Sequence, residues 1–127
     1  MEQRRPGRHE WPLEQKLQMI RDASFDGGSV RFFDRGYARE VTGQLRAWDL
    51  TWQAQCFPWC VSDLMPMLQN VADFGADHLN LQADVRPPAL GECVPLIERW
   101  CGLAEDAGVA LHVETHRDRM TRDLYLT

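Results

Sequence analysis

The feature that most constrains the fold of this chain is a helix-to-strand junction that occurs three times. The segments ASFDGGSV, ADFGADHL and AEDAGVAL begin at Ala23, Ala72 and Ala104. Each segment ends a helical pattern at glycine and starts a strand-forming run within a few residues, because glycine readily ends a helix. Repetition of this junction is typical of βα units whose strands run parallel.

Apolar periodicity and turn residues predict four helices and four strands. We expect helices at 12–23, 37–48, 62–75 (with Ser62 as N-cap) and 91–107, strands at 29–33, 51–57, 77–83 and from 110 onward, and the start of another helix at 121–127. The helix at 91–107 is expected to bury Val94, Ile97, Cys101 and Ala104. Strand starts lie roughly 20 to 35 residues apart, a spacing that leaves room for a helical crossover between parallel strands.

Length and charge limit the number of domains and the kinds of partner. Residues 1–10 are expected to form a flexible leader, and residues 11–127 one domain, because 127 residues suffice for a single core. A net charge of −5 does not favour a nucleic-acid partner, which usually requires a basic surface. No apolar run approaches the roughly 20 residues of a membrane span, and the basic leader has no secretory apolar segment. We therefore expect a cytoplasmic protein without a membrane or nucleic-acid partner.

The four cysteines, Cys56, Cys60, Cys93 and Cys101, form no CxxC pair. Their spacings match no common zinc-binding pattern. Reduced, structural thiols are therefore the favoured interpretation, ahead of disulfides or a zinc site.

Polar and apolar residues alternate in the later strands, so each of these strands has one polar face. The polar positions are Gln53 and Gln55, then His78, Asn80 and Gln82, then His112 and Glu114. Strands covered by helices on both faces usually contain continuous apolar runs instead. The pattern predicts an α/β fold, a partial (half) TIM barrel of repeated βα units with a polar interior. An open sheet with one solvated face is the alternative.

In a TIM barrel, functional residues lie at the carboxyl ends of the strands. Here those ends carry a set of polar and aromatic residues that suits a small polar ligand: Asp34, Arg35, Phe57, Trp59, Gln82, Asp84, Arg86, Glu114, His116 and Arg117. In the segment ALHVETHRDR, His112, Glu114 and His116 share one strand face. Such a group can hold a metal or move a proton, although His112 and His116 lie too far apart on a straight strand to bind the same ion easily.

The chain resembles the sugar phosphate isomerase/epimerase family, the xylose isomerase-like TIM barrels. The resemblance is carried by WPLEQKLQMIRDASFDGGSV (from Trp11), DHLNLQAD (from Asp77) and above all AEDAGVALHVETHRDRMTRDL (from Ala104). It implies a barrel with a divalent metal (Mn, Co, Zn or Mg) and acid–base glutamates that isomerises or epimerises a small polyol or keto sugar. Glu114 matches the family's first metal ligand, at the end of the fifth strand.

The resemblance and the chemistry of the side chains at the strand ends assign candidate roles to single residues. Glu114 is the candidate catalytic carboxylate and metal ligand, with an ion pair to Arg117 or Arg119 as the alternative. His116, Arg117, Gln82 and Arg86 are the candidate substrate-binding residues, with ordinary polar loop positions as the alternative.

A complete barrel needs about 250 residues, so this chain corresponds to roughly half of one. The resemblance therefore implies ancestry and a partial site, without implying that the chain alone is active. Two other functions remain open. One is a non-catalytic α/β half-barrel module that pairs with a second half or forms a homo-oligomer, since open sheet edges are rarely left bare. The other is a metal-independent binder of small molecules.

Overall fold

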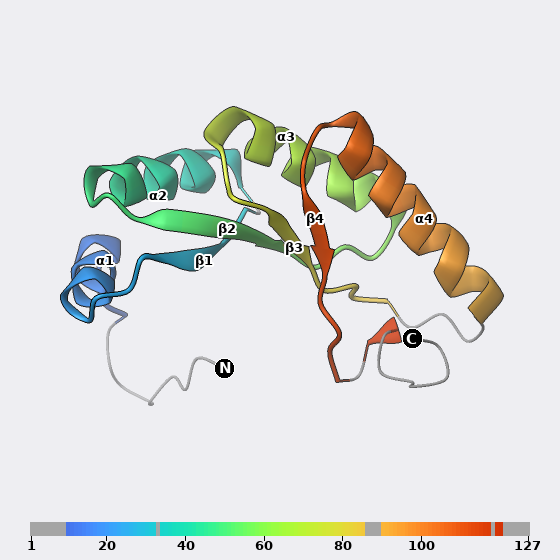
Figure 1. Cartoon of the computed structure of the whole chain (residues 1–127), viewed down its shortest axis with the longest axis horizontal. Coiled ribbons are helices and arrows are strands. Elements are labelled where there is room, and N and C mark those ends of the chain that lie inside the picture. The colour runs from blue at the N-terminus through green and yellow to red at the C-terminus, as the bar shows by residue number, and fades with distance from the viewer. Residues whose placement is uncertain (1–9, 33, 86–89, 118, 121–127) are drawn as a thin grey trace.

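Helices and strands alternate along the whole described part of the chain (Figure 1). The structure, a computed structural model, describes residues 10–32, 34–85, 90–117 and 119–120. Its elements are α1 (Leu13–Asp22), β1 (Gly27–Arg31), α2 (Arg35–Ala47), β2 (Thr51–Cys56), the short 3₁₀ turn η1 (Val61–Asp63), α3 (Leu64–Phe74), β3 (Leu79–Leu81), α4 (Leu90–Asp106) and β4 (Leu111–Val113). The predicted repeated βα layout is confirmed.

The four strands form one parallel sheet in the order β1-β2-β3-β4. Sheet order therefore equals chain order, as expected when each strand is followed by a helix that returns the chain to the next position. Figure 1 shows α2, α3 and α4 along one side of this sheet and α1 beside β1. This arrangement is the α/β half-barrel architecture that the sequence predicts.

One face of the sheet supplies most of the apolar core. Val30, Ala54, Cys56, Leu79 and Leu81 are all buried on the side that the helices cover. The polar residues that alternate with them lie on the opposite face. The alternation predicted from the sequence therefore separates a packed face from a polar face.

Several predicted boundaries need correction. The strands predicted at 77–83 and from 110 onward pair only over three residues each, because the ladder between them spans Leu79–Leu81 and Leu111–Val113. The strand predicted at 29–33 begins earlier, at Gly27. Phe33, residues 1–9 of the leader predicted at 1–10, and the helix start predicted at 121–127 lie outside the described residues.

Ser62 is not the N-cap of the third helix. The chain first makes η1, and the Asp63 carboxylate accepts the backbone N–H groups of Trp59 at 2.9 Å and Cys60 at 3.2 Å. These donors stabilise the charged carboxylate and hold the pKa of Asp63 below its usual value, the Trp59 bond most of all. A carboxylate accepts amide hydrogen bonds more strongly than a hydroxyl does, so Asp63 organises this turn.

The buried stripe of α4 also differs from the prediction. Val94 is 44% exposed and Cys101 is exposed, whereas Cys93 and Trp100 are buried and Ala104 is buried as predicted. The Trp100 indole Nε1 donates a hydrogen bond to the Cys60 carbonyl at 3.2 Å. Burying the large indole stabilises the fold more than burying a small thiol would, so α4 turns its Trp100 side, and not its Cys101 side, toward the core.

The four cysteines are free thiols, and only Cys56 and Cys93 are buried as structural thiols would be, whereas Cys60 and Cys101 are exposed. Burial raises the pKa of the Cys56 thiol to about 12. Burial, and then the charge of Glu92, raise the pKa of Cys93. Because the thiolate is the reactive form, both buried groups stay protonated and unreactive at mildly alkaline pH.

We therefore expect iodoacetamide at about pH 8 to modify only Cys60 and Cys101 in the folded chain. Mass spectrometry of tryptic peptides checks the sites, and the same reaction in concentrated urea, where all four thiols become accessible, is the control. Rapid modification of Cys56 in the folded chain would contradict this arrangement of the core.

Within the described part of the chain, no helix has the length and apolar character to cross a membrane.

Candidate functional site

The polar face of the sheet carries one side chain from each strand in a row across the ladder. The register pairs Arg31 with Gln55, Gln55 with Asn80, and Asn80 with His112. None of these four residues is fully buried, since they are half-buried or exposed. In a closed barrel this row would face the interior, where a polar ligand could contact several strands at once.

Glu114 lies at the carboxyl end of β4 and is held by the neighbouring strand. Its backbone N–H donates to the Leu81 carbonyl at 2.9 Å, which continues the ladder by one residue. Its Oε2 accepts a hydrogen bond from the Asn80 amide Nδ2 at 2.5 Å. The amide fixes one carboxylate oxygen, so the half-buried side chain has a set orientation at the edge where barrel enzymes place their functional groups.

The other predicted ligand-binding residues occupy different environments. Gln82 directly follows β3 and is buried, with 7% of its surface exposed. The register of the ladder places it beside Glu114, which directly follows β4. His116 and Arg117 are exposed, and the His116 Nδ1 lies 2.7 Å from the Arg117 carbonyl oxygen. Arg86 lies outside the described residues. The structure therefore brings Asn80, Gln82 and Glu114 together on two adjacent strands.

An ion pair joins the segments that follow β3 and β4. Arg119 pairs with Asp84, and the Met120 N–H donates to the Val85 carbonyl at 3.1 Å. Of the two arginines considered as alternative partners of Glu114, Arg117 and Arg119, the second is thus paired with a different carboxylate. The pairing returns the chain after Glu114 to the carboxyl edge of the sheet.

Two weaker candidates, Asp34 and Phe57, have structural explanations, and a third, Trp59, is exposed. The Asp34 carboxylate caps α2 by accepting the Tyr37 N–H at 2.8 Å. The Arg31 guanidinium stacks over the Phe57 ring at 4.8 Å. Trp59 is 65% exposed on the loop after β2.

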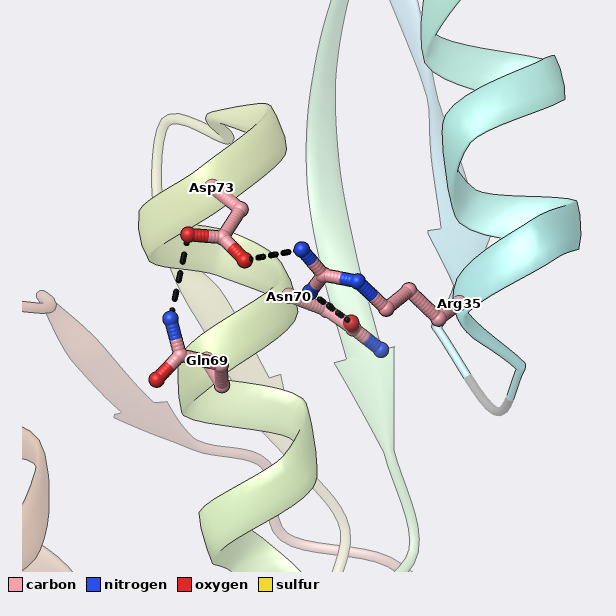
Figure 2. A network of polar contacts seen from close by, with 4 residues as sticks. All are labelled: Arg35, Gln69, Asn70 and Asp73. Carbon is pink, nitrogen blue, oxygen red and sulfur yellow. Dashed lines mark hydrogen bonds and ion pairs between the residues drawn. The ribbon is translucent and has the colours of Figure 1, made fainter.

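Arg35 belongs to a polar network between α2 and α3 that the sequence did not indicate (Figure 2). Its Nη2 lies 2.5 Å from an Asp73 oxygen, and its Nη1 donates to Asn70 at 3.4 Å. Gln69 donates to the other Asp73 oxygen at 3.0 Å, and the hydrogen bond from Arg35 lowers the pKa of Asp73. The buried Asn70 amide lies 3.5 Å from the Phe32 carbonyl oxygen. Arg35 thus links α2 to α3.

A second polar region lies at the amino ends of the strands. The His78 and His112 rings stack with centroids 4.1 Å apart. A cavity of about 330 Å³ opens beside His78 between the starts of β1 and β2. Barrel enzymes use the opposite end of the sheet, so we assign the candidate site to the carboxyl edge around Glu114.

A complete metal centre is not present among the described residues. No group of three or more His, Cys, Asp or Glu side chains in that part of the chain is arranged to hold an ion. Glu114 is a suitable oxygen ligand for a divalent cation, and its Oε2 accepts a hydrogen bond from the Asn80 amide nitrogen. Among the described residues, Glu114 is therefore a single candidate ligand and not part of a complete centre of His, Cys, Asp or Glu side chains.

Fold and site together define this chain as an α/β half-barrel with a polar inner face. No protein-family model and no curated protein matches its sequence. A solved structure that it resembles is type I 3-dehydroquinate dehydratase from Clostridium difficile, a TIM-barrel enzyme described with covalently modified comenic acid. The TM-score is 0.50 at 14% identity, over 74% of this chain and 40% of that enzyme's chain. This likeness supports a partial TIM barrel and concerns the fold alone.

Proposed function

We propose that this chain forms part of a barrel related to the sugar isomerases and epimerases, which binds a small polyol or keto sugar at the carboxyl edge of its sheet. The observation that carries the proposal is the position of Glu114 at that edge, oriented by the Asn80 amide. The resemblance of the segment around Glu114 to that family adds the reaction class.

Glu114 is the proposed acid–base group. A carboxylate at the end of a barrel strand can take a proton from a carbon next to a carbonyl and return it, which is the proton transfer that isomerisation needs. Asn80 positions this carboxylate, while Gln82 lies on the same strand end and is a candidate hydrogen-bonding partner for sugar hydroxyls. His116 and Arg117 are further candidates at the rim.

In this proposal Glu114 is also one ligand of a divalent metal, which would polarise the sugar carbonyl when bound. The remaining ligands would come from outside the described residues. The chain spans 40% of its barrel neighbour, so the remaining half of the site is proposed to come from further barrel units.

The proposal is tested by recording amide NMR spectra of the chain during titration with Mn²⁺, whose unpaired electrons broaden nearby signals. We expect selective broadening at Asn80, Gln82 and Glu114. Glu114→Gln, which removes the charge and keeps the shape, should weaken Mn²⁺ binding by more than about 10-fold. Glu105→Gln, at an exposed position on α4, is the matched control and should change nothing.

Broadening that persists in Glu114→Gln would refute the metal-ligand role. A keto-sugar titration without metal, followed in the same spectra, tests the alternative that the chain binds small molecules without a metal. Isomerisation assays with each sugar then report whether the chain is active by itself.

A non-catalytic half-barrel module that pairs with a second half is the second candidate function. It is favoured by β1 and β4, which form the two outer edges of the sheet and have no further strand beside them in the described part of the chain.

A further inference from the structure

The outer edge of β4 presents backbone groups that its own sheet does not use. Leu79 donates its N–H to the Ala110 carbonyl, and the Glu114 N–H donates to the Leu81 carbonyl. Hydrogen bonding alternates along a parallel strand, so every second residue along β4, from Ala110 to Glu114, directs its backbone groups toward β3. The residues that alternate with them direct their backbone groups to the outer side. Leu111 and Val113 therefore point their N–H and C=O groups away from β3.

The outer edge of β1 is arranged in the same way. The Thr51 N–H donates to the Asp26 carbonyl, which places alternate residues from Asp26 onward against β2. The residues between them, which include Gly27 and Ser29, direct their backbone groups outward. Within the described part of the chain, no strand pairs with the outer edge of β1 at these positions or with that of β4 at Leu111 and Val113, and native proteins rarely leave such edges exposed.

The positions of the helices indicate that the outer edge of β4 would pair with the outer edge of β1. α2 contacts both β1 and β2, so it covers the seam between these strands. No α-helix within the described residues follows β4, and Val113 is 37% exposed on the helix-covered face. At the other end, α1 precedes β1 and lies beside that edge strand (Figure 1). The apolar residues Met19 on α1 and Phe25 before β1 are 44% and 65% exposed.

Charge complementarity also favours the pairing of β4 with β1. Arg31 ends β1 and Glu114 follows β4, and both side chains belong to the polar face. Joining β4 to β1 brings a guanidinium toward a carboxylate at the carboxyl edge, while Arg31 can keep its contact with Phe57.

We propose that two copies of this chain associate head to tail, with β4 of each copy alongside β1 of the other. The two seams are related by a twofold axis, so the assembly closes without leaving an open edge. The second copy supplies its α1 to cover Leu111 and Val113, and the eight strands form a barrel. This inference rests on the proposed half-barrel function and names its partner as a second copy. Pairing of two β4 edges with each other would leave β1 and α1 uncovered.

Sedimentation equilibrium over a dilution series tests the pairing. The parent chain is expected to be a dimer of twice 14.7 kDa. Ser29→Pro and Val113→Pro each remove one outward N–H without removing a bond inside the sheet, since proline is tolerated where the N–H faces away from the ladder. Each variant is expected to sediment as a monomer where the parent is a dimer. Ser29→Ala and Val113→Thr keep the amide and are the matched controls.

A mixture of the two proline variants sharpens the test. Their heterodimer has one intact seam, from β4 of the Ser29→Pro chain to β1 of the Val113→Pro chain, so mixing should restore part of the dimer. If Ser29→Pro remained a full dimer, the seam would not involve β1 and the head-to-tail arrangement would be wrong.

Hydrogen exchange of the parent chain provides a measurement that needs no variant. The amides of Ser29 and Val113 are expected to exchange at least 10-fold more slowly at dimer concentrations than after dilution to monomer. A parent chain that is monomeric throughout, or that dimerises without protecting these amides, overturns the proposal. These measurements use neither metal nor sugar, so their failure leaves the role of Glu114 to its own titration.

Discussion

Replacing Trp100 with alanine is expected to lower the free energy of unfolding by about 3–5 kcal/mol. Trp100 has no exposed surface, and its indole joins α4 to the loop after β2 through the bond to the Cys60 carbonyl. The variant leaves a large cavity and an unpaired carbonyl. Because a domain of this size is usually stable by only about 5–15 kcal/mol, the loss should be visible as a large shift of the urea midpoint.

Trp59→Ala is the matched control for this variant. Trp59 is 65% exposed and lies one residue before Cys60 in the chain, so its removal should change stability by less than about 0.5 kcal/mol. Trp100→Phe should fall between the two, since it keeps most of the packing and loses the hydrogen bond. Equal losses for Trp59→Ala and Trp100→Ala would contradict the observed rotation of α4.

Gly27→Ala is expected to destabilise the fold by about 1–3 kcal/mol, because overpacking forces the backbone to move. A Cβ at this position would lie 2.2 Å from the Thr51 carbonyl oxygen, and Gly27 pairs with Thr51 in the ladder. The neighbouring atom belongs to the backbone of β2, so it cannot be avoided by rotating a side chain. Thermal and urea denaturation would both measure the loss.

Gly43→Ala is the control for this prediction. Gly43 lies within α2, and nothing in the described structure comes within 4 Å of a Cβ built there. Alanine should therefore stabilise the helix by about 0.5–1 kcal/mol, opposite in sign to the effect at Gly27. Destabilisation by both substitutions would show that the close approach at Gly27 is not the cause.

The alternation of helices and strands could be predicted from sequence because local signals were strong. Gly75 and Gly108, at predicted helix ends, both have positive φ, which glycine adopts without strain. The stripe of α4 could not be predicted in the same way, since Val94 and Cys101 follow helical spacing as well as Cys93 and Trp100 do. The contact with Cys60, 40 residues away from Trp100, decides between these stripes.

The candidate site was predictable only in part. The position of Glu114 on a polar strand face follows from alternation within one strand. Its partner Asn80 depends on the register between β3 and β4, which pairs Asn80 with His112 and places Glu114 two residues further along the same face. The network of Arg35 with Asp73 likewise joins two helices that only the tertiary fold brings together.

The equality of sheet order and chain order gives this fold the character of a repeat array. Contacts join elements that are neighbours along the chain or separated by one repeat, so stability should approach a sum of unit and nearest-neighbour terms. Such local connectivity favours rapid folding, because few distant segments must meet first. It also means that a gene could gain or lose a repeat at either end without rewiring the others, which makes the architecture well suited to growth by duplication.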